Sequence, residues 1–238
     1  GKVIEKTDTP DEPVKGEVLE PVEEPAEESS GGFGEQVLQA AELIALKEAY
    51  LPNNYIPPQD PVPPRTPREK FAANIAAIQK LKEIEQRVAN GGSPAFEDEQ
   101  KILAQYTGWG GLSDAFDPNK STWSNEYSQL KAALSESEYE AARSSTLTAF
   151  YTPATVIHPI YRALERFGVK GGKILEPSMG TGAFLAHGHF GSSDAKFYGV
   201  ELDSITGRIA QKLYPEASIK VAGFETTDRR DFYDLAVG

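Results

Sequence analysis

A short apolar run that ends in a glycine turn is the feature that most restricts the fold of this chain. Ile174 and Leu175 lie in the run, and Gly180-Thr181-Gly182 follows after four residues. Glycines in such a turn let the backbone approach a ligand without interference from a Cβ atom, and the turn points the N-terminus of the next helix at that ligand. The pattern predicts a strand, a tight turn and a helix, with a binding site at the turn.

The sequence around this turn alternates between predicted strands and predicted helices. We predict strands at 173–176, 196–201, 218–223 and 232–237, and helices at 154–167, from about residue 182, and at 203–213. This alternation implies right-handed crossovers and a parallel sheet. The predicted fold class is therefore α/β, with a partial Rossmann-like sheet domain over residues 147–238.

An acidic residue stands at the end of the second predicted strand. Glu201 follows Gly182 by 19 residues, and an acid about 20 residues after the glycine turn can accept both hydroxyl hydrogens of a ribose. Asp203 could instead take that role or cap the next helix. A dinucleotide site usually has a third glycine where Leu185 stands. Glu176 would repel a pyrophosphate but could pair with the ammonium of a methionine group, which favours S-adenosylmethionine over NAD.

Several segments resemble the N6-adenine DNA methyltransferases, the family that includes the modification subunits of type I restriction systems. Residues 176–185 (Glu-Pro-Ser-Met-Gly-Thr-Gly-Ala-Phe-Leu) resemble motif I, and residues 147–153 (Leu-Thr-Ala-Phe-Tyr-Thr-Pro) look like motif X. Residues 198–203 resemble motif II, and residues 222–225 occupy the place of motif III. With the Gly-Trp-Gly-Gly turn at 108–111, the chain looks most similar to the methylase segments of large methylase–helicase fusion proteins of mobile elements.

The resemblance implies a DNA adenine-N6 methyltransferase with S-adenosylmethionine as cofactor. It implies cofactor binding by Phe150, Tyr151, Thr152, Pro153, Glu176, Pro177, Ser178, Gly180, Thr181, Gly182, Phe184, Glu201, Leu202 and Glu225. Glu201 would bind the ribose, and Leu202 would lie against the adenine. Phe224 separates Glu225 from the glycine of motif III, and could contact the adenine or pack in the core. The family's (Asn/Asp)-Pro-Pro-(Tyr/Phe) motif would lie beyond Gly238, so we expect no catalytic residue in this chain and no activity of the fragment alone.

Two other functions stay open at this point. The chain could be a non-catalytic Rossmann-like scaffold module of a large helicase protein, or part of a methyltransferase that acts on protein or RNA. DNA is expected to bind through regions outside this chain, and a helicase domain in the same polypeptide is a candidate partner.

The first 146 residues divide into an acidic segment and a helical region. Residues 1–32 contain ten acidic residues against three lysines, in a chain with a formal net charge of −12. Such a segment buries too little apolar surface to offset its ordering entropy, so we predict a disordered linker. Residues 33–146 are predicted to be helical, with an extended connector at 51–67 that contains seven prolines.

Helix signals are clear in this second region. Thr66, Pro67 and Glu69 predict a capping box with proline at the first helical position. The apolar stripe that follows is Phe71, Ile75, Ile78, Leu81, Ile84 and Val88, and it ends at Asn90-Gly91-Gly92. Further helices are predicted at 35–50, 95–105, 124–134 and 136–145, the last with a capping box of Ser135 and Glu138.

Composition excludes some classes of site. The chain has no cysteine, which excludes disulfides and thiolate zinc sites and favours a cytoplasmic protein. It has no apolar run of about 18 residues and no signal peptide at its start. His187 and His189 flank a glycine, but no acid stands at a suitable spacing, so we predict no metal site. His158 is predicted to be a packed helix residue.

Overall fold

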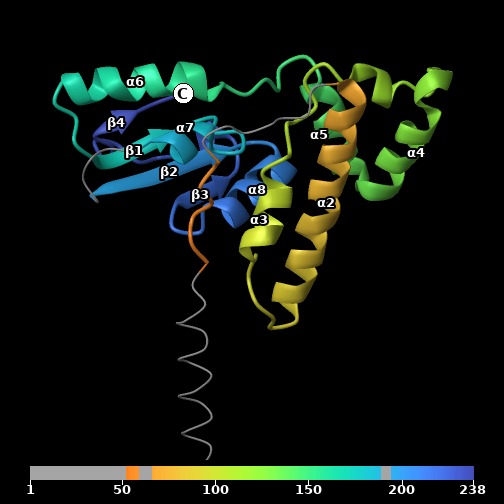
Figure 1. Ribbon diagram of the computed structural model, residues 1–238, viewed down its shortest axis with the longest axis horizontal. Helices are drawn as coiled ribbons and strands as arrows, with labels where there is room; N and C mark the ends of the chain where they lie inside the picture. The colour runs from red at the N-terminus through yellow and green to blue at the C-terminus, as the bar shows by residue number, and fades with distance from the viewer. Residues whose placement is uncertain (1–51, 59–65, 189–193) are drawn as a thin grey trace, which may run out of the picture. The chain divides into compact units, whose positions relative to one another are not determined.

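The computed structural model describes residues 52–58, 66–188 and 194–238, and Figure 1 shows their arrangement. Residues Tyr50–Gly238 form one compact unit. The described α-helices are α2 (Pro67–Ala89), α3 (Glu97–Leu103), α4 (Ser124–Ala133), α5 (Glu136–Ser145), α6 (Ala154–Arg166), α7 (Ala183–His187) and α8 (Ser204–Leu213). The strands are β1 (Gly172–Glu176), β2 (Ala195–Glu201), β3 (Ser218–Val221) and β4 (Leu235–Ala236). The predicted α/β class is confirmed at this level, while the predicted linker at 1–32 and helix at 35–50 lie outside the described residues.

Helix α2 begins at the predicted capping box. The Thr66 hydroxyl accepts a hydrogen bond from the Glu69 N–H, and the Glu69 carboxylate accepts one from the Thr66 N–H at 2.8 Å. Pro67 occupies the first helical position, where its missing N–H costs no hydrogen bond. The predicted apolar stripe is buried from Phe71 to Ile84, but Val88 near the end of the helix is exposed.

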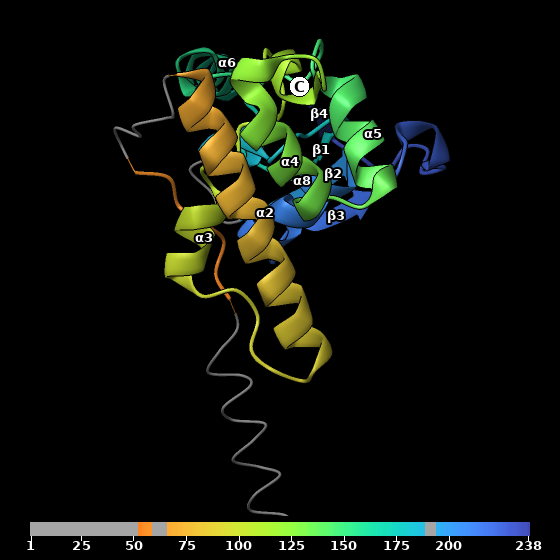
Figure 2. The ribbon, with the colours of Figure 1, turned by 90° about the vertical axis from the view of Figure 1, so that its right-hand side faces the viewer.

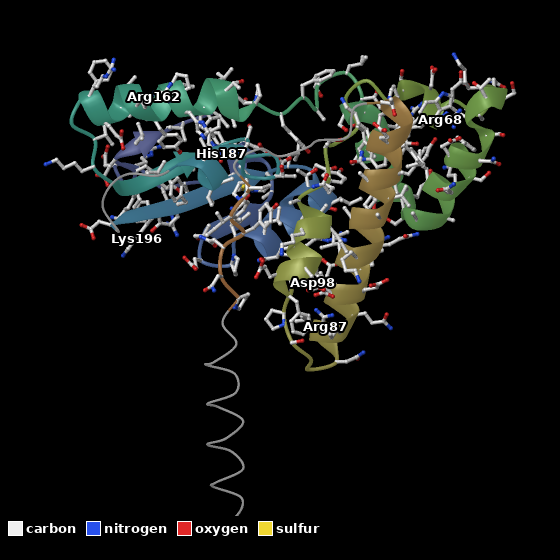
Figure 3. The ribbon with its side chains drawn as sticks, viewed as in Figure 1. Arg68, Arg87, Asp98, Arg162, His187 and Lys196 are labelled. Atoms are coloured by element: carbon white, nitrogen blue, oxygen red, sulfur yellow. The ribbon has the colours of Figure 1, made fainter. Side chains whose placement is uncertain are left out.

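The helical region packs around a group of aromatic rings. The Trp109 ring lies 5.3 Å from that of Phe116 and 6.2 Å from that of Phe71, between ring centroids. The predicted helices at 95–105, 124–134 and 136–145 correspond to α3, α4 and α5, with ends shifted by up to two residues. Figure 2 shows α4 beside α2, with which it is in contact. Arg87 near the end of α2 joins this helix to α3 through two hydrogen bonds to the Glu99 carboxylate, at 2.8 and 2.6 Å (Figure 3).

The four described strands form one parallel sheet in the order β3-β2-β1-β4. The register pairs Ile174 with Phe197 on β2 and with Leu235 on β4. Ile174 packs with residues of α6 and α7, which lie together against the sheet (Figure 1). The C-terminal ends of β1 and β2 therefore meet at the same edge of the sheet.

Two predicted strands are shorter than expected. The strand predicted at 218–223 ends at Val221, and the chain enters a 3-10 turn at Phe224–Thr226. The strand predicted at 232–237 is reduced to two residues. Phe232 and Tyr233 pack their rings on Tyr198, at centroid distances of 5.2 and 5.5 Å. Phe232 and Tyr233 thus make ring contacts, although both lie within the strand predicted at 232–237.

Helix α8 connects the sheet to the helical region. Its Arg208 guanidinium bonds to Glu85 on α2 at 2.8 Å and to Glu138 on α5 at 3.0 Å. The Gln100 side chain on α3 donates to the Lys212 carbonyl at the end of α8 at 2.9 Å. These contacts fix the helical region beside the edge where β1 and β2 end. Among the helices of residues 66–188 and 194–238, none combines the length and apolarity needed to cross a membrane.

Candidate ligand-binding site

The glycine turn after β1 has the backbone conformation that its sequence predicts. Gly180 and Gly182 have φ angles of +55° and +84°, a region that residues with a side chain rarely adopt. A Cβ atom on Gly180 would lie 2.8 Å from Cε1 of Tyr151, inside van der Waals contact. Glycine at 180 thus permits both the turn and the close packing of Tyr151 upon it.

The acid at the end of β2 lies directly against this turn. The Gly180 N–H donates to Oε2 of Glu201 at 2.8 Å, and the Asp203 N–H donates to Oε1 at 2.8 Å. Burial raises the pKa of Glu201, while these backbone donors act in the opposite direction. The structure therefore brings together the two features, glycine turn and strand-end acid, on which the predicted site depends.

Glu176, the last residue of β1, is buried beside the same turn. Its side chain is 5% exposed, and Oε2 has no hydrogen-bond partner among the described residues. Burial raises the pKa of Glu176 to about 8, although the N–H groups of Phe184 and Leu185 at the start of α7 oppose the rise. A buried acceptor without a partner is unusual in a folded protein and fits a site that is completed by a ligand.

Asp203 caps helix α8. Its Oδ1 accepts hydrogen bonds from the Thr206 N–H at 2.7 Å and from the Thr206 hydroxyl at 2.6 Å. Of the two roles open to Asp203 from sequence, the structure shows the cap, which engages this oxygen twice. Glu201 is therefore left as the acid to which the sequence assigned ribose binding.

These residues line one pocket of about 640 Å³ at the C-terminal ends of β1 and β2. Of the residues predicted for cofactor binding, the pocket is lined by Phe150, Tyr151, Thr152, Glu176, Ser178, Gly180, Phe184, Glu201 and Leu202. The remaining five are not among its lining residues: Pro153, Pro177, Thr181, Gly182 and Glu225. Pro153 precedes α6, Gly182 precedes α7, and Thr181 lines a different hollow next to Tyr214.

The segment predicted to lie near an adenine ring is placed apart from the pocket. Glu225 is exposed, and its carboxylate folds back on Gly223. Phe224 is 49% exposed, so it does not pack in the core. Neither side chain lines the pocket.

The helical region forms a wall that the sequence did not assign to the site. The added lining residues from this region include Tyr106, Gly108, Trp109, Ala141, Ser144 and Ser145. The glycine-rich turn around Trp109 stood out in the sequence because it holds one of only two tryptophans. Its position against the glycine turn after β1 is a result of tertiary packing, and no local pattern indicates it.

The histidines are arranged differently from the prediction. His158 is exposed on α6, because Ile157 and Tyr161 occupy the inward face of that helix, so the prediction that it is packed is wrong. Its Nε2 lies 3.2 Å from Nδ1 of His187, which sits at the end of α7 beneath α6 (Figure 3). No group of three or more metal-ligating side chains occurs in the described parts of the chain, and His189 lies outside them.

A parallel α/β sheet with a pocket at its strand ends defines a broad class of ligand-binding domains. Among curated proteins, this chain is similar to the Defense against restriction protein B of Escherichia phage P1, with 29% identity over 174 residues. The similarity covers 72% of this chain but only 6% of that protein, which is far longer. No protein-family model and no solved structure matches the chain.

This similarity corrects the functional interpretation of the sequence. The matching protein is named for defence against restriction and not for DNA methylation. The interpretation as part of an N6-adenine DNA methyltransferase is therefore wrong. The motif at 176–185 describes a local strand, turn and helix geometry, and the segment at 147–153 is a turn and extended chain before α6. Such local geometry alone does not determine a reaction.

Proposed function

We propose that this chain is a non-catalytic, Rossmann-like module of a larger protein that acts in defence against restriction, and that its pocket binds S-adenosylmethionine or a related adenosyl ligand. The larger protein is suggested by the phage relative, of which the chain spans 6%. The predicted partners, DNA and a helicase domain in the same polypeptide, stay predictions.

The observation that most supports ligand binding is the hydrogen bond of 2.8 Å between the Gly180 N–H and Glu201. It brings the turn and the acid to one rim of a parallel sheet, where ligands of doubly wound folds bind. Glu201 would accept the ribose hydroxyl hydrogens there, since each carboxylate oxygen has a second lone pair beyond its backbone bond.

The residues present also fit the amino-acid end of S-adenosylmethionine. Glu176 offers a buried carboxylate oxygen without a partner, which an ammonium group would satisfy. A phosphate at the same place would find no lysine, arginine or histidine among the residues that line the pocket, which argues against a dinucleotide. The pocket volume of about 640 Å³ lies within the usual range for small-molecule sites.

The proposal is tested by thermal unfolding of the chain with S-adenosylmethionine and with S-adenosylhomocysteine. A ligand at 100 times its Kd stabilises the folded state by about 2.7 kcal/mol, which shifts the Tm measurably. Glu201→Gln keeps one acceptor oxygen for the Gly180 N–H, but its amide nitrogen cannot accept a hydrogen bond from a ribose hydroxyl. We therefore expect the ligand-induced shift in Tm to be lost.

Glu225→Gln is the matched control, because it changes an exposed carboxylate outside the pocket. We expect it to keep the full ligand-induced shift. Calorimetry that detects no binding of any adenosyl ligand would contradict the proposal and leave a scaffold without a ligand.

A further inference from the structure

Three buried side-chain atoms in the described residues have no hydrogen-bond partner. They are Oη of Tyr106, Nε1 of Trp109 and Oε2 of Glu176. All three residues line the same pocket, although they come from different parts of the chain. Buried polar atoms are almost always bonded in folded proteins, so three such atoms around one pocket indicate a polar ligand.

The chemistry of the three atoms restricts that ligand. The Trp109 Nε1–H can only donate, and the Tyr106 hydroxyl can donate as well. The Glu176 carboxylate accepts. A matching ligand therefore presents both a hydrogen-bond acceptor and a hydrogen-bond donor within one pocket.

The two donors are held on a rigid turn. The side chain of Asn74 on α2, fully buried, donates to the Gly108 carbonyl at 2.6 Å and accepts from the Thr107 N–H at 2.9 Å. On the other side of the turn, a Cβ atom on Gly108 would lie 2.8 Å from the Tyr151 hydroxyl. The turn is thus fixed between α2 and the segment before α6, and its donors are positioned before any ligand arrives.

The neighbours of the Tyr106 hydroxyl leave it able to form a hydrogen bond with a ligand. Its polar neighbours include Thr206 and Trp109, and the hydroxyl has no hydrogen-bond partner among the described residues. The Thr206 hydroxyl also gives its hydrogen to Asp203, at 2.6 Å. It therefore supplies no donor to Tyr106.

We infer that the pocket selects the zwitterionic amino-acid end of an adenosyl ligand, with Glu176 accepting from its ammonium group and Tyr106 and Trp109 donating to its carboxylate. This inference rests on the proposed adenosyl site. It assigns specificity to the helical wall, outside the strand–turn–helix unit.

The test compares S-adenosylhomocysteine with 5′-methylthioadenosine, which has the same adenine, ribose and sulfur but no amino-acid end. Calorimetry on the full chain should show S-adenosylhomocysteine binding at least about tenfold more tightly, the usual effect of hydrogen bonds to charged groups. Trp109→Phe and Tyr106→Phe keep an aromatic ring and remove only the donor. Each should weaken S-adenosylhomocysteine by about tenfold and leave 5′-methylthioadenosine unchanged.

The affinity of each variant for 5′-methylthioadenosine is the control, because an unchanged value shows that the substitution has not disrupted the pocket. An unchanged affinity ratio in both variants would overturn the inference while the proposed adenosyl site stands. Failure of both ligands to bind the unaltered chain would overturn the adenosyl site as well.

Discussion

Replacement of Glu176 by glutamine should change how the stability of the chain depends on pH. Burial raises the pKa of this carboxyl from 4.5 to about 8 in the folded state. Between these two values the unfolded chain has released the proton and the folded chain has retained it. Folding therefore takes up a proton, and the free energy of unfolding falls as pH rises through this window.

The magnitude follows from the two pKa values. Each pH unit in the window costs the folded state about 1.4 kcal/mol, so the full effect above pH 8 is on the order of 4–5 kcal/mol. Glutamine at 176 has nearly the same shape, keeps one acceptor oxygen and does not titrate. We expect Glu176→Gln and the unaltered chain to be about equally stable near pH 4.5, with the variant more stable at pH 8.5.

Urea unfolding at intervals between pH 4.5 and 8.5 measures this difference directly. Glu225→Gln serves as the control, since it removes an exposed carboxylate, and we expect it to follow the unaltered chain. Parallel stability curves for the unaltered chain and Glu176→Gln would refute the argument, because the carboxylate would then be no more costly when folded than when unfolded.

Two further predictions concern the turn and helix α8. Gly180→Ala places a Cβ atom against the Tyr151 ring at a φ of +55°, and should destabilise the chain by about 1–3 kcal/mol in urea unfolding; a loss below about 0.5 kcal/mol would mean that the turn relaxes freely. Arg208→Met removes the partner of Glu85 and Glu138, and should cost about 1–3 kcal/mol at pH 7. Burial raises the pKa of Glu138, but hydrogen bonds from the Ser135 N–H, Arg208 and Lys82 bring it down to about 2 from 4.5. The stability that this carboxylate contributes is present above pH 4.5 and is lost as pH falls through 2, so the effect of Arg208→Met should shrink in acid; an equal effect at pH 7 and pH 2.5 would contradict it.

Sequence predicted the elements whose causes are local. The capping box of Thr66 and Glu69 needs only residues three apart, and it begins α2 as predicted. The glycine turn at 180–182 and the acid at 201 are positioned by one strand–turn–helix unit and the next strand. Parallel strands end at a common edge, so these two features could be placed together without coordinates.

The sequence did not predict features that depend on packing between distant segments. Tyr106 and Trp109 reach the pocket because α2 and α8 hold the helical region beside the sheet edge. Phe232 and Tyr233 of the strand predicted at 232–237 pack their rings on Tyr198 instead, a contact that no period in the sequence reveals. The predicted function was the largest error, because a local motif describes a local geometry and not what the whole protein does.

The most direct test is a crystal structure of the chain with S-adenosylhomocysteine. We predict that the ribose hydroxyls bond to Glu201, that the ammonium group lies at Glu176, and that the turn at 106–109 faces the carboxylate. A ligand bound elsewhere, or a pocket that stays empty at saturating concentration, would contradict the proposal that the rim between β1 and β2 is an adenosyl site.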